Sequence, residues 1–440
     1  MAVNEKYVSN LSRMIKQETV SFYGQDDLSK FFEFHKLLKE LFPSLFAVCE
    51  IEKYEASLLL KWKGKRSDKP VLFMNHHDTV EPQDEAAWTH PPFSGEVFEG
   101  KLWGRGTLDN KGGLWGMLQA ADDLAAEGFV PGQDIYFESS CNEETTFQGA
   151  LHLSEKLQER GIRFDYVLDE GGMITYEPIG GAKDTFAMIG MGERGCSNLL
   201  FTAKGNGGHA SSPDYDTPLV RLGRFMAEAD RTGLFKKEIS PVILEMFRRL
   251  APSTSGPIKL IYSHPKLFAP VLKLVMPKTS GTAKALLQTT IAFTMAKGSE
   301  GRNVIPSEAS VVGDMRVSHH QGYEKSLKAI ASLAAKYDIE LEVLEEAMVS
   351  PLADYKSDAY KLMEEAVTHA FPNVKCAPYI MTGCSDARFM ARLTDNCFHF
   401  VPFIIDKQQL ESIHGIDESV DVSTLEGAVE FYKYLMKELK

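Results

Sequence analysis

Cysteine is scarce in this sequence of 440 residues, and its spacing matches neither a zinc-binding motif nor a dense disulfide framework. The six cysteines are Cys49, Cys141, Cys196, Cys376, Cys384 and Cys397. We therefore expect reduced thiols, and a fold that depends on buried apolar cores. At this length one core is too small for the chain, so two domains are expected.

The sequence also lacks long apolar runs and an excess of basic residues. Residues 1–11 contain no apolar segment typical of a signal peptide, and no uninterrupted apolar run reaches the length that spans a bilayer. There are 61 acidic against 48 basic residues, a formal net charge of −13. Phosphate binding needs a basic surface. We therefore expect a cytoplasmic protein with neither nucleic acid nor a membrane as its partner.

Against these absences, one acidic pair is prominent. Glu143 and Glu144 follow the strand-like run of residues 134–140. Successive side chains in extended backbone point to opposite faces, so one glutamate can hold a metal while the other handles a proton. An isolated pair of this kind is more often a solvated acidic turn. Its interpretation depends on other segments of the chain.

A second segment is an apolar run, residues 71–75, that ends in His76-His77-Asp78. It is typical of a buried strand. His76 and Asp78 share one side of extended backbone, so His76 is a candidate metal ligand and Asp78 a candidate acceptor for its second ring N–H. His77 faces the other way, and we interpret it as a bystander.

Asp109 stands just before residues 114–121, whose apolar spacing predicts a helix. Two divalent cations about 3.5 Å apart repel by about 19 kcal/mol even at a dielectric constant of about 20, so a two-metal site needs an anion between them. Asp109 is the candidate for that bridge. A helix N-cap is the alternative role.

Two later segments add further ligand candidates. Glu170 follows the apolar run 164–169, and His414 lies in a loop before the amphipathic segment 424–439. The candidate ligands are thus His76, Asp109, Glu144, Glu170 and His414. Nitrogen and oxygen ligands without thiolate suit zinc, cobalt or manganese. Glu143 would take a proton from a metal-bound water and pass it to a leaving nitrogen, which predicts metal-assisted hydrolysis of an amide.

These motifs, in this order, resemble the di-zinc metallopeptidase family that contains aminoacylase, carboxypeptidase S, bacterial glutamate carboxypeptidase and succinyl-diaminopimelate desuccinylase. Two further stretches carry the resemblance, Gly208-His209-Ala-Ser-x-Pro213 and Gly383-x-Ser-Asp386-Ala-Arg388. It covers almost the whole chain. In the detail of residues 88–96, 102–111 and 168–172 the sequence is most similar to carboxypeptidase S and the N-acyl amino acid hydrolases.

The resemblance implies an α/β fold. A mixed-sheet zinc-peptidase catalytic domain flanked by helices is expected from residues 1–192 and 348–440. An inserted α+β lid and dimerisation domain, with a four-stranded antiparallel sheet and helices, is expected from residues 193–347. The family further implies a homodimer that forms through the lid.

The resemblance also implies a role for each ligand. His76 and Glu170 would bind one zinc ion, Glu144 and His414 the other, and Asp109 would bridge them. The peptide bond after Asp109 is expected to be cis.

Further roles follow from the same resemblance. Asp78 would orient His76, and Glu143 would be the general base. His209 would reach into the partner subunit's active site and, with Asn303, stabilise the oxyanion of the tetrahedral intermediate. Without the family, His209 is more typical of a surface residue.

The substrate-binding residues are less defined. Arg316 and Arg388 are candidates for holding a substrate carboxylate, because a planar guanidinium offers bidentate geometry; a structural ion pair is the alternative for Arg388. Cys384 occupies a position where a small residue is more usual, so it is either a soft ligand or a packing residue. The apolar stretch of residues 234–297 would line an acyl pocket, or belong to the core or a dimer interface.

The sequence thus predicts a metal-dependent hydrolase that cleaves the amide bond of a small peptide or N-acyl amino acid with a free carboxylate. A hydroxide held by two zinc ions would attack, and cobalt or manganese could replace zinc. Two alternatives remain open. One is a non-catalytic binding protein on the same fold, and the other is net synthesis of N-acyl amino acids by the reverse reaction.

Overall fold

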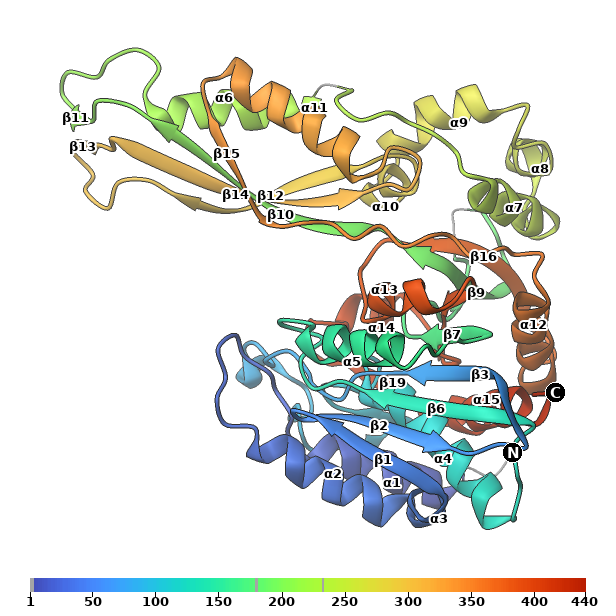
Figure 1. The fold of residues 1–440 in the computed structure, drawn as a ribbon. Helices are drawn as coiled ribbons and strands as arrows, with labels where there is room; N and C mark the ends of the chain where they lie inside the picture. The colour runs from blue at the N-terminus through green and yellow to red at the C-terminus, as the bar shows by residue number, and fades with distance from the viewer. Residues whose placement is uncertain (1–3, 179–180, 232) are drawn as a thin grey trace.

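Two β-sheets organise the chain (Figure 1). The computed structural model describes residues 4–178, 181–231 and 233–440. A ten-stranded mixed sheet with helices forms the catalytic domain, and a four-stranded antiparallel sheet with two helices forms a lid above it in the view of Figure 1. This is the α/β architecture with an inserted α+β lid that the sequence predicted.

The large sheet has the strand order β1-β2-β6-β3-β7-β17-β9-β8-β18, with β16 paired to β9. Its strands are β1 (Cys49–Tyr54), β2 (Ser57–Trp62), β3 (Arg66–Met74), β6 (Gln133–Ser139), β7 (Tyr166–Asp169), β8 (Ile174–Tyr176), β9 (Thr185–Glu193), β16 (Lys375–Met381), β17 (Cys397–His399) and β18 (Ile404–Ile405). Strands β6, β3 and β7 are neighbours and run parallel. Their carboxyl ends therefore meet at one edge of the sheet.

Both faces of these central strands are covered by helices, which explains their continuous apolar runs. The first face packs on α1 (Glu5–Lys16), α2 (Ser29–Leu41), α3 (Pro43–Val48), α4 (Lys111–Ala126), α12 (Asp358–Ala370) and α15 (Leu425–Lys437). The second face packs on α5 (Gln148–Glu159) and α13 (Ala387–Met390). Alternate residues of β3 divide between them: Val71 and Phe73 join the first core, Leu72 and Met74 the second.

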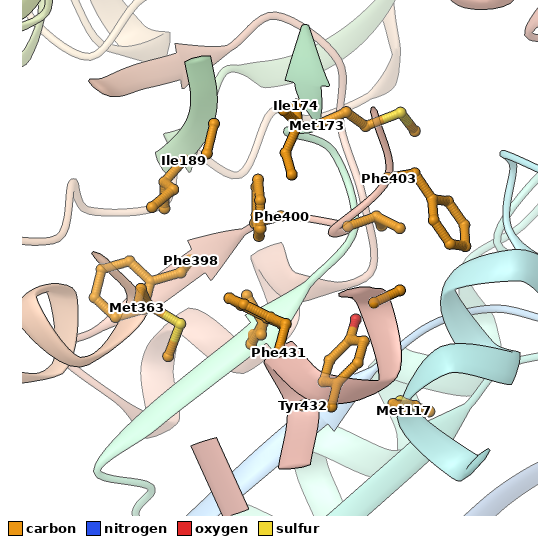
Figure 2. Packing of buried hydrophobic residues seen from close by; sticks show 14 of the residues in the cluster. Met117, Met173, Ile174, Ile189, Met363, Phe398, Phe400, Phe403, Phe431 and Tyr432 are labelled. Carbon is orange, nitrogen blue, oxygen red and sulfur yellow. The ribbon is translucent and has the colours of Figure 1, made fainter. Parts of the chain in front are cut away.

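The first core is rich in aromatic and methionine side chains. Figure 2 shows part of it, where residues of the sheet meet α4, α12 and α15. The Phe400 and Phe431 rings, for example, pack edge to face with their centroids 5.3 Å apart. Such pairs add to the stabilisation that comes from burying their area.

The lid sheet has the order β12-β14-β10-β15. Its elements are β10 (Gly195–Lys204), β12 (Thr290–Lys297), β14 (Glu308–Val317), β15 (Glu340–Glu345), α6 (Pro218–Arg231) and α11 (Tyr323–Lys336). Alternation along β14 buries one face against the helices. Because the lid has its own hydrophobic core, it is a folded domain.

Shorter elements complete the described chain. At the free end of the lid, β11 (Gly208–His209) pairs with β13 (Val304–Ile305). Near the catalytic sheet, β4 (Val97–Phe98), β5 (Lys101–Trp103) and β19 (Ser419–Asp421) form a small sheet. Other short elements are α14 (Lys407–Ser412) and the 3-10 turns η1 (Glu85–Ala87), η2 (Ala251–Ser253), η3 (Met276–Lys278), η4 (Ala391–Leu393) and η5 (Val422–Thr424).

The apolar stretch of residues 234–297 is buried in one part and exposed to water in another. Its helices are α7 (Pro241–Leu250), α8 (Gly256–Ser263), α9 (Ala269–Val275) and α10 (Gly281–Ala285). Helix α7 buries Ile243, Met246 and Phe247 in the first core. Most apolar side chains of α8 and α9 instead face water. None of the described helices has both the length and the apolarity needed to cross a bilayer.

A disulfide joins the two domains. Cys196 on β10 is bonded to Cys384, in the loop between β16 and α13. The expectation of six reduced thiols is therefore wrong for this pair, because the fold brings together residues that are 188 positions apart. The other four cysteines are free. Disulfides are rare in cytosolic proteins. The Cys196–Cys384 disulfide is therefore unusual for a protein of the cytoplasm, and the cytoplasmic location stays a prediction.

Candidate active site

Three adjacent parallel strands deliver the candidate ligands to one place. His76 and Asp78 follow β3, Glu143 and Glu144 follow β6, and Glu170 follows β7. Because these strands share a direction, the segments that follow them emerge on the same side of the sheet. The structure therefore brings together side chains that lie up to 94 positions apart in the sequence.

Asp109 lies between the two candidate histidines. Its Oδ1 is 2.9 Å from His76 Nε2, and its Oδ2 is 3.0 Å from His414 Nε2. Each oxygen thus faces a different imidazole, which is the arrangement that a bridging carboxylate requires. The Asp109–Asn110 peptide bond is cis, as predicted.

Each histidine has a second carboxylate beside it. Glu170 Oε2 is 3.3 Å from His76 Nε2, and Glu144 Oε2 is 3.1 Å from His414 Nε2. In both trios, His76-Asp109-Glu170 and His414-Asp109-Glu144, the potential ligand atoms lie within 4.8 Å of one another. These side chains lie together as the family resemblance implied, and their roles as metal ligands stay predictions.

Asp78 supports the site from within the protein. Its carboxylate accepts hydrogen bonds from the backbone N–H groups of Glu143 and Glu144, both at 3.1 Å, and from Ser21 Oγ at 2.6 Å. His76 Nδ1 is 3.0 Å from the backbone oxygen of Asp78 and 3.4 Å from its Oδ1. Asp78 therefore orients His76 chiefly through its carbonyl, while its carboxylate holds the glutamate loop in place.

His77 is directed elsewhere. It packs against Phe31, Phe34 and His35, and its Nδ1 is 2.8 Å from Ser139 Oγ. It takes no part in the groups of candidate ligands. The two faces of extended backbone separate His76 from His77, as the alternation predicted.

The donor set has the charge and chemistry that divalent cations require. Burial raises the pKa of Glu170 to about 8 and that of Glu144 to about 6. Hydrogen bonds with Asp109 and Glu144 raise the pKa of His414 to about 10. Without bound cations, protons on these carboxyl groups would neutralise part of their negative charge. Glu144 Oε1 is also buried without a hydrogen-bond partner among the described residues. These side chains therefore fit a metal centre of nitrogen and oxygen ligands.

Glu143 differs from its neighbour in its surroundings. Its side chain is buried, and burial raises the pKa of its carboxyl well above the usual range. It belongs to a candidate trio with His76 and Glu144, but is in neither trio that includes Asp109. A carboxyl beside the ligands with a raised pKa has the proton affinity that a general base needs.

Glu418 is a structural residue that sequence reasoning missed. It is fully buried, and its Oε1 accepts hydrogen bonds from the backbone N–H groups of Leu108 and Asp109, at 2.7 and 3.1 Å. Its Oε2 accepts one from Arg105 Nη1 at 2.6 Å. Glu418 thus ties the His414 loop to the Asp109 loop. An acid four residues after His414 was the available signal, and only the fold shows what it contacts.

Asp169 and Glu193 hold another loop. Asp169 Oδ2 accepts hydrogen bonds from Ser385 Oγ and the N–H of Ala387, both at 2.9 Å, and Glu193 Oε2 accepts one from the N–H of Ser385 at 2.6 Å. Asp386 bonds Ser140. The Gly-x-Ser-Asp-Ala-Arg motif is therefore anchored to β7 and β9 by buried carboxylates.

His209 and Asn303 meet at the free end of the lid. His209 pairs with Val304 across β11 and β13, and the N–H of Ala210 donates to the carbonyl of Asn303 at 2.9 Å. The side chain of His209 is exposed, and its Nδ1 is 2.7 Å from Ser211 Oγ. Figure 1 shows β11 and β13 far from the catalytic sheet of the same chain. Within the described chain, His209 has no contact with the candidate ligands.

The two candidate arginines occupy different environments. Arg316 makes a bidentate pair with Asp314, at 2.6 and 2.9 Å, and its Nη1 lies 2.7 Å from Cys196 Sγ. Arg388 is buried, with its guanidinium 3.9 Å from the centroid of the Phe147 ring. Cys384 packs in the disulfide rather than among the ligands. The substrate-binding roles of both arginines stay predictions.

Comparison with known proteins identifies the family. The protein-family model described as peptidase family M20/M25/M40 matches residues 72–438 of this sequence, which include every candidate ligand. The chain belongs to this family. Members of the M20 family are metal-dependent hydrolases, and the chain is an enzyme of that class.

Individual relatives agree with this assignment. The chain is 30% identical over 443 residues to a probable carboxypeptidase S-like 2 of Dictyostelium discoideum, covering 97% of this chain and 84% of that protein. It is also 30% identical over 430 residues to the N-fatty-acyl-amino acid synthase/hydrolase PM20D1 of Homo sapiens, covering 96% and 85%.

Among solved structures, the fold is similar to an M20 family metallo-carboxypeptidase, Sso-CP2, from Sulfolobus solfataricus. The TM-score is 0.72 with 16% identity, and the match covers 98% of each chain. At this identity the likeness concerns the fold, including its catalytic and lid domains. It confirms the M20 architecture of the chain.

Proposed function

We propose that this M20 enzyme binds two zinc ions and hydrolyses the amide bond of an N-acyl amino acid or small peptide that carries a free carboxylate. The observation that carries the proposal is the position of Asp109 between His76 and His414, with one oxygen toward each. His76 and Glu170 would hold one ion, and Glu144 and His414 the other. The names of the two relatives support the substrate class.

When bound, the cations would lower the pKa of a water molecule and polarise the substrate carbonyl. Glu143 would take the proton from the attacking water and deliver it to the leaving nitrogen. Asp78 would keep Glu143 and Glu144 in place through their backbone N–H groups. Glu418 would do the same for the Asp109 loop.

The lid suggests that the active site is completed by a second copy of the chain. His209 and Asn303 lie together, exposed, and away from their own catalytic domain. In a homodimer formed through the lids, they would approach the partner subunit's active site and donate to the oxyanion. Within a single chain, β11 holds His209 too far from the catalytic domain for it to act in that domain's active site.

Mixing two inactive variants tests this arrangement. Glu143→Gln and His209→Ala homodimers are each expected to lose at least about a hundredfold in kcat. A heterodimer, purified through two different tags, joins an intact Glu143 on one chain to an intact His209 on the other. One of its two sites is complete, so it should regain up to about half of the wild-type kcat per dimer.

The matched control pairs Glu143→Gln with Asp109→Ala. Both changes act in a chain's own metal site, so this heterodimer has no complete site and should stay inactive. If the Glu143→Gln and His209→Ala pair also stays inactive although the heterodimer forms, His209 does not act across the dimer.

Paired substrates test the proposed substrate class. An N-acyl amino acid and its C-terminal carboxamide differ only in the group that Arg316 or Arg388 would hold. A charge-assisted hydrogen bond contributes about 1.5–3 kcal/mol, so kcat/KM for the free acid should be about tenfold to a hundredfold higher. Chelation should abolish both rates, and zinc should restore them. Equal rates for acid and amide would contradict the carboxylate requirement.

Net synthesis is a second candidate reaction. The human relative is named as both synthase and hydrolase. A site that lowers the barrier for hydrolysis lowers it equally for condensation, so concentrations of acid and amine determine the direction.

A further inference from the structure

One segment of this acidic protein contains no acidic residue. Residues 246–299 include no Asp or Glu, whereas the chain as a whole has 61 in 440 residues. At that frequency a segment of this length would hold about seven. The same segment has eight basic residues, Arg248, Arg249, Lys259, Lys266, Lys273, Lys278, Lys284 and Lys297. Its charge is therefore opposite to that of the rest of the protein.

The helices in this segment expose apolar side chains. Leu267, Val271, Leu274 and Val275 stand at i, i+4, i+7 and i+8, which places them on one face of α9 and its preceding turn. This face is in water: Leu267 is 74% exposed and Leu274 61%. The opposite face holds Leu272, which is buried. Leu260, at 55%, adds an exposed apolar residue from α8.

Lysines lie between these apolar residues. Lys259, Lys266, Lys273 and Lys278 form no ion pair with any carboxylate that the structure describes. A surface hollow beside the helices is lined in part by Arg248, His264 and Lys266. Glu245 also lines it, but its carboxylate is bound by Arg248 and Arg249. The positive charge of Lys259, Lys266 and Lys278 is therefore available to a partner, whereas that of Lys273 is felt in part by Glu238.

The combination of charge and apolar side chains selects one kind of partner. In a two-fold contact centred on these helices, this cationic segment would face its own copy, and like charges would repel. A nucleic acid would leave the leucines in water. An anionic lipid surface satisfies both features, because leucines enter the acyl boundary while lysines remain among negative headgroups.

We propose that residues 256–278, which carry α8 and α9, form a docking surface for an anionic lipid bilayer. This revises the expectation of no membrane partner, which rested on the lack of a spanning segment. Docking in the interface needs only an amphipathic face. Figure 1 places α8 and α9 at the opposite end of the lid from β11 and β13, so docking leaves the free end of the lid accessible.

Co-sedimentation of the full chain with vesicles tests the proposal. Vesicles of phosphatidylcholine with added phosphatidylserine should bind at least about tenfold more protein than phosphatidylcholine alone, and salt should weaken this binding. The double variant Leu267→Ser/Leu274→Ser should reduce binding at least about tenfold. Both side chains are exposed, so amide hydrolysis and thermal stability should be unchanged.

The matched control is Leu344→Ser. Leu344 is 51% exposed on β15 and is followed by Glu345 and Glu346, so its replacement should leave vesicle binding unchanged. Three outcomes would overturn the proposal: no preference for phosphatidylserine vesicles, equal binding by the double variant, or a change in oligomeric state on replacing Leu267 and Leu274. The last would show that α8 and α9 contact another copy of the chain.

Discussion

Replacing Glu143 with Gln should abolish turnover while the metal stays bound. Glutamine keeps the size of the side chain but cannot accept and return a proton, and general acid–base catalysis contributes about 10²–10⁴ in rate. Because neither of the two trios around Asp109 includes Glu143, the bound cations should remain. We expect kcat to fall by about that factor, with unchanged metal content by elemental analysis.

Glu144→Gln is the informative comparison. The same chemical change one residue later removes a charged oxygen that lies 3.1 Å from His414 Nε2. This variant should lose metal as well as activity, whereas Glu155→Gln on the exposed surface of α5 should change neither. An active Glu143→Gln enzyme under metal-replete conditions would show that another group moves the proton.

Asp109→Ala should have the second large effect. Among the described residues, it removes the only carboxylate that lies within 3.0 Å of both candidate histidines. Without it, two neighbouring cations lose the anion that reduces their repulsion. We expect the metal content to fall from the proposed two ions per chain to one or fewer. kcat/KM should fall to roughly a thousandth of the wild-type value or below.

The control for this change is Asp417→Ala. Asp417 lies in the His414 loop, but among the described residues its carboxylate accepts hydrogen bonds only from Thr89, at 2.7 and 2.8 Å. This variant should keep both ions. Two tightly bound ions in Asp109→Ala would contradict the bridging role of Asp109 and require a different arrangement of ligands.

Local sequence patterns predicted the strands that carry the candidate site. Apolar runs that end in polar residues predicted β3, β6 and β7 and the positions of His76, Glu144 and Glu170 after them. Alternation along extended backbone separated His76 from His77. These patterns are short-range, because the period of a strand is a property of consecutive residues.

Patterns of this kind could not predict contacts between distant segments. Glu418 supports the backbone of Asp109, 309 positions away, and no periodicity links the two. The Cys196–Cys384 bond spans 188 positions. Such contacts depend on how sheets and loops pack against one another, which is decided by the whole buried surface.

The amino-acid sequence by itself therefore determined the types of candidate ligand, their order along the chain and the strands that carry them. The sequence also shows directly that residues 246–299 contain no Asp or Glu. Tertiary structure alone decided that Asp109 lies between His76 and His414, that His209 is far from its own catalytic domain, and that the apolar face of α9 points into water. The physical reason is that composition and periodicity are local, whereas exposure and distance are properties of the packed chain.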